Sequence, residues 1–178
     1  ENFSSEYAGA VSIFIKDTIL KSKYKNLTTV YGHTKFKKDF LKKYTNLSID
    51  EKSIFQSSSN LYVQNFIKKK EVYNSDIIEI HNRPNYLKKI LLLKKPKKVL
   101  FFHNDPLTMN GSKSIKDRLY LIENLDKIIF NSEWCKNRFI EDLPKIFNKI
   151  DKYEIVYQST SKTKVDIKKK KKIITFVG

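Results

Sequence analysis

Two polar clusters that open with the same pair of residue types follow two short apolar runs near the middle of the chain. The runs are Ile77–Ile80 and Val99–Phe102. The first is followed by His81, Asn82 and Arg83, and the second by His103, Asn104 and Asp105. Imidazole, amide, guanidinium and carboxylate groups can bind hydroxyls or phosphates, and a histidine can also move a proton near neutral pH. These side chains are the strongest candidates for chemistry in this sequence.

An apolar, Lys-rich segment of helix length separates the two runs, and it opens at Pro84, a residue type tolerated in a first helical turn. A strand, a helix and a second strand form a βαβ unit, whose parallel strands end on the same side of the sheet. Open α/β sheets bind ligands at that carboxyl edge. We therefore expect His81 and His103 to meet at the rim of one open cleft. His103 alone could equally be a structural hydrogen-bonding residue, and the second His-Asn pair is what favours a shared site.

The rest of the chain alternates between helical and strand patterns. Strands of four to six residues that alternate with helices predict a doubly wound, mostly parallel, Rossmann-like α/β sheet. Residues 33–58 are polar, and we interpret them as loop and short helix. The predicted helices cover residues 8–21, 59–71, 115–124 and 133–141, and the predicted strands are Leu27–Tyr31, Lys127–Phe130, Tyr153–Tyr157 and Ile173–Val177.

Caps and buried stripes support several of these helices. Ser114, with Asp117 three residues later, predicts a capping box for the helix over residues 115–124. Ser132 is expected to cap the helix over residues 133–141, with Trp134 and Phe139 as core anchors. The predicted inward stripes elsewhere are Val11, Phe14, Ile15, Thr18 and Ile19 in the first helix, and Leu61, Phe66 and Ile67 in the second.

The chain of 178 residues is long enough for one sizeable core and carries a formal net charge of +17. Most of that charge comes from Lys, because Arg83, Arg118 and Arg138 are the only arginines. A surface that binds phosphate through guanidinium groups normally has more of them. Two explanations stay open: the charge binds anionic membranes or phosphorylated substrates, or it reflects a compositional bias toward Lys.

Several classes of site are absent from the sequence. There is no G-x-G-x-x-G fingerprint and no Walker A motif, which argues against a nicotinamide dehydrogenase and a P-loop nucleotidase. Three His and one Cys without close spacing do not predict a zinc site, and Cys135 is expected to be a small buried apolar residue. No apolar run approaches the length of a membrane span.

Two further residues could belong to the same edge. Gly9 stands just before the first predicted helix, where a glycine lets a ligand approach the free N–H groups of a helix amino terminus. A packing role for Gly9 is an equally good interpretation. His33 follows Gly32 at the end of a predicted strand, and it could line the edge as well.

Four strings in this order, EIHNRP, FFHNDP, NSEWCKNRF and YEIVYQST, resemble the amino-terminal half of a GT-B glycosyltransferase. The resemblance is to the large retaining family 4, which includes lipopolysaccharide and other cell-envelope glycan transferases, and it covers nearly all of residues 6–178. The motifs are moderately specific, because HNRP and HNDP occur together and in order.

The resemblance implies transfer of a sugar from a nucleotide-sugar to a cell-envelope glycan or lipid-linked acceptor, with retention and without an obligatory metal or other cofactor. His103 would be the catalytic residue, in contact with the donor sugar near the reacting carbon. The implied substrate-binding residues are Gly9, His81, Asn82, Arg83, Asn104 and Asp105. The implied location is the cytoplasm, with peripheral contact to an anionic membrane.

The chain also departs from the family pattern. The family has a Gly-Gly pair before its first helix, whereas Ala8-Gly9 matches only the second glycine. We expect the family's first strand, which lies upstream of this loop, to be missing. We expect residues 1–172 to form the Rossmann-like acceptor-side domain and residues 173–178 to begin a truncated, donor-binding second domain.

A basic α/β module that binds nucleic acid is the main alternative. The net charge of +17 supports it, but the sequence has no basic helix interleaved with exposed aromatic residues and no known nucleic-acid motif. A flavodoxin-like or response-regulator-like signalling domain would need an acidic cluster at the first strand end, which is lacking. Titrations with salt against liposomes and against DNA separate the transferase from the nucleic-acid module.

Overall fold

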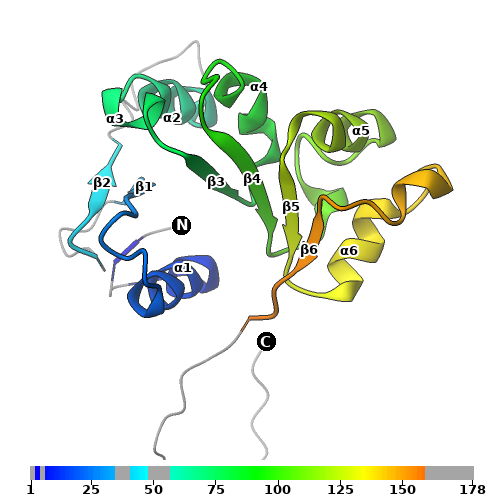
Figure 1. The fold of residues 1–178 in the computed structure, drawn as a ribbon, viewed down its shortest axis with the longest axis horizontal. Helices are drawn as coiled ribbons and strands as arrows, with labels where there is room; N and C mark the ends of the chain where they lie inside the picture. The colour runs from blue at the N-terminus through cyan, green and yellow to red at the C-terminus, as the bar shows by residue number, and fades with distance from the viewer. Residues whose placement is uncertain (1–2, 5–6, 35–40, 48–56, 159–178) are drawn as a thin grey trace, which may run out of the picture.

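The computed structural model describes residues 3–4, 7–34, 41–47 and 57–158. They form an α/β fold with a four-stranded, all-parallel sheet of order β3-β4-β5-β6 and a separate two-stranded parallel sheet, β1-β2 (Figure 1). The strands are β1 (Val30–Gly32), β2 (Tyr44–Asn46), β3 (Ile77–His81), β4 (Lys97–Phe102), β5 (Lys127–Phe130) and β6 (Tyr153–Ile155).

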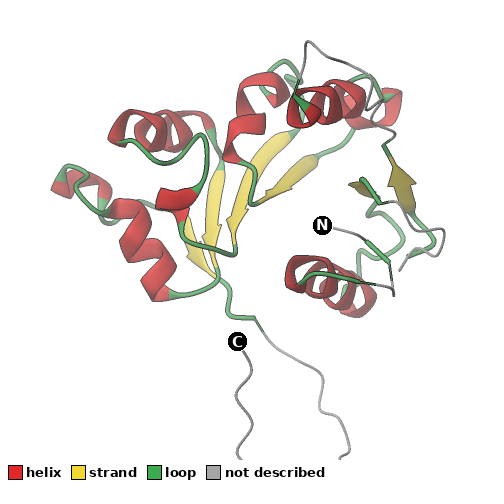
Figure 2. Cartoon of the chain, turned by 180° about the vertical axis from the view of Figure 1, so that it is seen from behind, coloured by secondary structure: helices red, strands yellow, loops and turns green. Residues whose placement is uncertain are grey.

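Helices precede and connect these strands (Figure 2). The α-helices are α1 (Ala10–Lys21), α2 (Ser58–Ile67), α3 (Lys70–Tyr73), α4 (Leu87–Ile90), α5 (Ile115–Asn124) and α6 (Glu133–Ile140). Short 3-10 turns cover Pro84–Tyr86, Pro106–Thr108 and Lys145–Phe147. None of the helices in the part of the chain that the structure describes is long and apolar enough to cross a membrane.

The order of the strands decides where the core lies. Strands β3 to β6 follow one another across the sheet in chain order. Right-handed crossovers between neighbouring parallel strands that always step in one direction place every connecting helix on the same face. The core lies on that face, where alternate strand residues meet α2 to α6: Ile78, Ile80, Leu100, Phe102, Ile128 and Phe130.

Aromatic rings fill the part of this core nearest the carboxyl edge. Phe102 and Phe130 are opposite each other in the register of β4 and β5, and their rings stack 5.8 Å apart. Phe139 from α6 closes on both rings, and Tyr153 from β6 meets Phe139 edge-on. Close aromatic packing of this kind adds to the free energy of burial and fixes α6 against the sheet.

The opposite face of the sheet is covered differently. Helix α1 packs there through Phe14, whose ring lies edge-on to Phe101 of β4 at 5.2 Å. Phe101 is buried, whereas Ile77 at the start of β3 is 58% exposed. Among the described residues this face is thus covered near the carboxyl end of the strands and open near the start of β3.

Several predicted elements are confirmed. Helix α5 has the predicted bounds, and Ser114 and Asp117 form the predicted capping box. Strand β5 has the predicted bounds, and the Ser132 side chain caps α6 by accepting from the Cys135 backbone N–H. Phe139 is fully buried as expected. The predicted strand Ile173–Val177 and the predicted domain boundary after residue 172 lie outside the described residues.

Other predictions were wrong in detail. Trp134 is 59% exposed and lies beside the Arg138 guanidinium, so it is not a core anchor. The segment interpreted as loop and short helix contains a strand, β2, which pairs with β1. Strand β1 starts at Val30 rather than at Leu27, because hydrogen-bonded turns continue to Leu27 after α1.

The helices also differ from expectation in extent and orientation. The segment after Pro84 forms a 3-10 turn and only the short α4, because the chain must reach β4 directly after Pro96. The helix predicted over residues 59–71 is divided into α2 and α3. Thr18, placed in the inward stripe of α1, is exposed.

The loop after β4 is pinned at Gly111. This residue has a φ of 95°, in the left-handed region. A Cβ atom there would lie 2.7 Å from the backbone nitrogen of Asn85, in the turn that follows β3. Because backbone atoms cannot swing aside as a flexible side chain can, the loop after β4 reaches the turn after β3 only with glycine at this position.

We expect Gly111→Ala to lower the free energy of unfolding by roughly 1–3 kcal/mol, through backbone strain and the contact with Asn85. Chemical denaturation of the two proteins measures the difference. The neighbouring exposed residue offers a control, Asn110→Ala, which we expect to change stability little. Equal stability of the Gly111→Ala and Asn110→Ala proteins would contradict this explanation.

Candidate active site

The two predicted histidines meet at the carboxyl edge of the sheet. The Nδ1 atom of His81, the last residue of β3, lies 2.8 Å from the Nε2 atom of His103, which follows β4. Their rings stack with centroids 5.1 Å apart. The prediction that the βαβ unit brings these imidazoles together is confirmed.

Each imidazole has a further partner on its far side. The Nε2 atom of His81 lies 3.0 Å from the Oε1 atom of Glu79, on the same face of β3. The Nδ1 atom of His103 lies 2.9 Å from the amide nitrogen of Gln158, which follows β6. Glu79, His81, His103 and Gln158 thus form one continuous hydrogen-bonded row, which we call the histidine row. It runs along the sheet edge from β3 to the segment after β6.

The side chain of Asn82 joins the ends of β3 and β4. Its Oδ1 atom accepts from the His103 backbone N–H at 2.8 Å, and its Nδ2 atom donates to Asn104 Oδ1 at 3.2 Å. Its own backbone N–H donates to the Phe101 carbonyl. Asn82 has a φ of 52°, a conformation that asparagine tolerates better than most residues. Its amide therefore holds the two strand ends together, and the predicted ligand contact would have to compete with these bonds.

A third strand end fixes the backbone of His103. The Nδ2 atom of Asn131, directly after β5, donates to the His103 carbonyl at 2.7 Å. Cys135 lies beneath, with its sulfur 3.4 Å from the Asn104 carbonyl. Burial raises the pKa of the Cys135 thiol to about 12, so it stays protonated and unreactive, as its predicted role as a small buried residue requires.

His103 is buried against aromatic rings. The Phe101 ring lies parallel to the imidazole with centroids 4.2 Å apart, and the Phe14 ring of α1 meets it edge-on at 5.0 Å. Only 7% of His103 is exposed. Burial, and then the neighbouring His81, lower the pKa of His103 to about 4, while Glu79 acts in the opposite direction. His103 is therefore neutral at physiological pH.

Glu79 keeps its charge beside the imidazoles. Burial acts to raise its pKa, but the hydrogen bond from His81, the largest of the opposing effects, helps to hold the pKa below its usual value. A carboxylate with a lowered pKa is an acceptor at neutral pH and cannot donate a proton to its partner.

The other predicted residues have separate surroundings. Arg83 is exposed, and its guanidinium donates to the adjacent Asn82 carbonyl. Asp105 accepts from the Leu107 backbone N–H and pairs with Arg138 of α6 at 3.3 Å, so its carboxylate shapes the loop. Gly9 is the N-cap of α1, the helix that carries Phe14 to His103.

His33 does not join the histidine row. Its Nδ1 atom lies 3.0 Å from the Leu47 carbonyl, beside the small sheet of β1 and β2. This contact fits a structural role for His33 and makes the residue a useful reference for experiments on the other two histidines.

Sequence reasoning missed three members of the site: Glu79, Asn131 and Gln158. Glu79 could have been found, since residues two apart on a strand share a face and Glu79 stands two before His81. Asn131 could also have been found, because it follows β5 as His103 follows β4. Nothing in the sequence near Gln158 signals its contact with a histidine 55 positions away.

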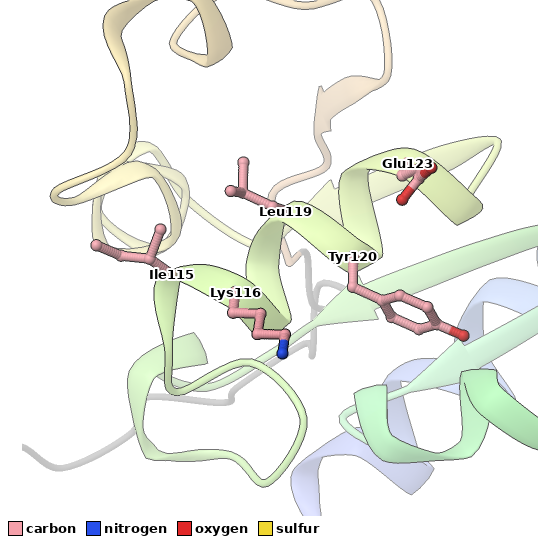
Figure 3. A pocket seen from close by; sticks show the side chains of 5 residues that line it. All are labelled: Ile115, Lys116, Leu119, Tyr120 and Glu123. Carbon is pink, nitrogen blue, oxygen red and sulfur yellow. The ribbon is translucent and has the colours of Figure 1, made fainter.

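No group of His, Cys, Asp and Glu side chains within the described ranges could hold a metal ion. A shallow hollow on the outer side of α5 is lined by Ile115, Lys116, Leu119, Tyr120 and Glu123 (Figure 3). Because all of these residues come from successive turns of one helix, the hollow has no second wall that could enclose a ligand. Among the described residues, the histidine row is therefore the best candidate for an active site.

A scan against protein-family models and a search of curated proteins both find no match for this chain. The properties of the site consequently rest on its own residues and geometry.

The lowered pKa of His103 predicts a pH dependence of stability. Between pH 6.5 and about 4 the unfolded imidazole binds a proton and the folded one does not. The free energy of unfolding should therefore fall as the pH drops through this window, by roughly 1–3 kcal/mol. Denaturation curves at a series of pH values, for the parent and for His103→Asn, measure the part due to this residue. Identical slopes in the two proteins would show that His103 does not titrate with a lowered pKa.

Proposed function

We propose that this chain is the acceptor-side, amino-terminal domain of a GT-B glycosyltransferase of the retaining family 4 type. The observation that carries the proposal is the meeting of His81 and His103 at the carboxyl edge of a parallel sheet. These histidines open the HNRP and HNDP strings on which the family resemblance depends. The four-stranded parallel sheet flanked by helices supports the Rossmann-like architecture that such a domain needs.

In the proposed reaction, a sugar leaves a nucleotide and joins a hydroxyl of a glycan or lipid-linked acceptor with retention of configuration. His103 lies beside the reacting carbon and forms a hydrogen bond to the donor sugar. Gly9, His81, Asn82, Arg83, Asn104 and Asp105 shape the surroundings of the substrates. Preorganised hydrogen-bonding groups in a site that excludes water stabilise developing charge at little cost in reorganisation. No metal is required for this chemistry.

The remaining parts of the proposal concern partners and location. In a GT-B enzyme, a second domain provides most contacts to the nucleotide-sugar. The formal net charge of +17 favours an anionic surface, so the proposed location is the cytoplasm with peripheral contact to the inner face of the membrane. The proposed acceptor is a cell-envelope glycan or lipid, which such a surface would present.

The test is sugar transfer by the protein in its natural length, with His103→Ala as the variant. We expect a loss of turnover on the order of 10²-fold, because a hydrogen bond that strengthens in the transition state is removed. A purely structural histidine would instead cost roughly 1–3 kcal/mol of stability and leave turnover near normal. Measuring turnover and the unfolding midpoint on the same variant separates the two roles.

His33→Ala is the matched control, since the His33 imidazole lies beside the Leu47 carbonyl and outside the histidine row. We expect near-normal turnover from this control. Absence of transfer from every nucleotide-sugar tested with the parent protein would contradict the proposed function itself.

Residues 1–178 alone should bind nucleotide-sugars only weakly and transfer no sugar. In a GT-B enzyme the donor lies between two domains, and electrostatic preorganisation needs both walls. Isothermal titration calorimetry with a panel of nucleotide-sugars measures this directly. Micromolar binding to this chain would contradict the division of roles between the two domains.

A further inference from the structure

The direction of every hydrogen bond in the histidine row follows from its acidic end. Glu79 is ionised at neutral pH and so can only accept. The His81 Nε2 atom, 3.0 Å away, must therefore carry a proton and donate it to the carboxylate. In a neutral imidazole one nitrogen carries the proton and the other is a bare acceptor. The Nδ1 atom of a neutral His81 is then the bare one.

The same reasoning continues through the second ring. A bare His81 Nδ1 at 2.8 Å requires a donor, which is the Nε2–H of His103. A neutral His103 then has a bare Nδ1 atom. The nitrogen of the Gln158 amide lies 2.9 Å from that atom and supplies the matching N–H donor. All bonds thus run in one direction, from Gln158 through His103 and His81 to Glu79.

The opposite direction carries a clear cost. For His81 to donate to His103 while still donating to Glu79, it must be an imidazolium. His103 would then have to donate from Nδ1, and the Gln158 amide would have to present its oxygen. This alternative therefore needs a charged His81 2.8 Å from His103 and a reversed Gln158 amide, whereas the observed row, with the Gln158 nitrogen facing His103, needs neither.

We propose that Glu79 and His81 are positioning residues that hold His103 in its Nε2–H tautomer, so that its Nδ1 atom serves only as a hydrogen-bond acceptor. The Gln158 amide occupies the place that a ligand donor would take. The ligand group that fits this atom is a hydroxyl or an amide N–H, whereas an unprotonated phosphate or carboxylate oxygen has no proton to offer. The identification of the hydroxyl as that of a sugar rests on the proposed function, but the tautomer does not.

The tautomer can be measured without any substrate. In ¹⁵N-labelled protein, long-range proton–nitrogen correlations distinguish a bare ring nitrogen from a protonated one. The chain has 3 histidines, so a His33→Gln variant and a His81→Asn variant assign the signals. At pH 7 we expect His103 to show a bare Nδ1 and a protonated Nε2, and His81 to show the same pattern. A protonated Nδ1 on His103, or an imidazolium at His81, would overturn the proposal.

The role of Glu79 is tested by Glu79→Gln. A carboxamide can donate as well as accept, so the row loses its fixed direction. We expect the Nδ1–H tautomer of His103 to rise from a minor to a comparable share. Glu154→Gln is the matched control: Glu154 is also a half-exposed strand carboxylate, 3.2 Å from Lys127, but it lies on β6 outside the row. An unchanged tautomer in Glu79→Gln would overturn the positioning role.

The ligand class is tested with inorganic sulfate, which carries no proton at pH 7. The basic surface will bind sulfate in many places, but the ring nitrogens of His103 should keep their shifts because neither sulfate nor a bare Nδ1 has a proton to donate. A saturable shift with protonation at Nδ1 would overturn the acceptor assignment. These spectra require neither a donor nor an acceptor substrate. A negative result would therefore contradict the tautomer and leave the transferase proposal unaffected, because the turnover assay tests that proposal separately.

Discussion

The amide of Asn82 is the interaction on which the geometry of the site depends. It bonds the backbone of His103 and the side chain of Asn104, and so fixes the ends of β3 and β4 relative to one another. The two imidazoles can form a hydrogen bond of 2.8 Å only if β3 and β4 end side by side at the same edge of the sheet. Backbone pairing sets the register of β3 and β4 as far as His81 and Phe101. Beyond that point the Asn82 amide holds the two strand ends together. The left-handed backbone of Asn82 places its side chain across the gap.

Much of the fold follows from local rules that the sequence displays openly. The Ser114 and Asp117 capping box and the short run of Lys127–Phe130 were predictable, because caps and buried strands depend on nearby residues. Trp134 was not, since an aromatic residue on a short helix can face either the core or solvent. The contact with the Arg138 side chain, one turn later, favours the exposed position. Strand β2 was missed because its pairing with β1 is a long-range property.

In the candidate site, too, some features follow from local sequence patterns and others depend on tertiary packing. The convergence of His81 and His103 was predictable, because parallel strands must end together. The roles of the individual groups were not. Asp105 could have faced a ligand, yet it pairs with Arg138 of α6, and only tertiary packing decides that outcome. Gln158 approaches His103 because β6 is next to β5 in the sheet, which no local pattern around either residue encodes.

Successive residues of β3 and β4 point to opposite faces of the sheet, so neighbouring positions are under different constraints. Ile78, Ile80, Leu100 and Phe102 face the packed core, where a change of shape lowers stability. The residues between and just after them, Glu79, His81, Phe101 and His103, face the other side and make up the histidine row and its aromatic support. Selection can therefore alter what this edge recognises through one set of positions while the other keeps the protein folded.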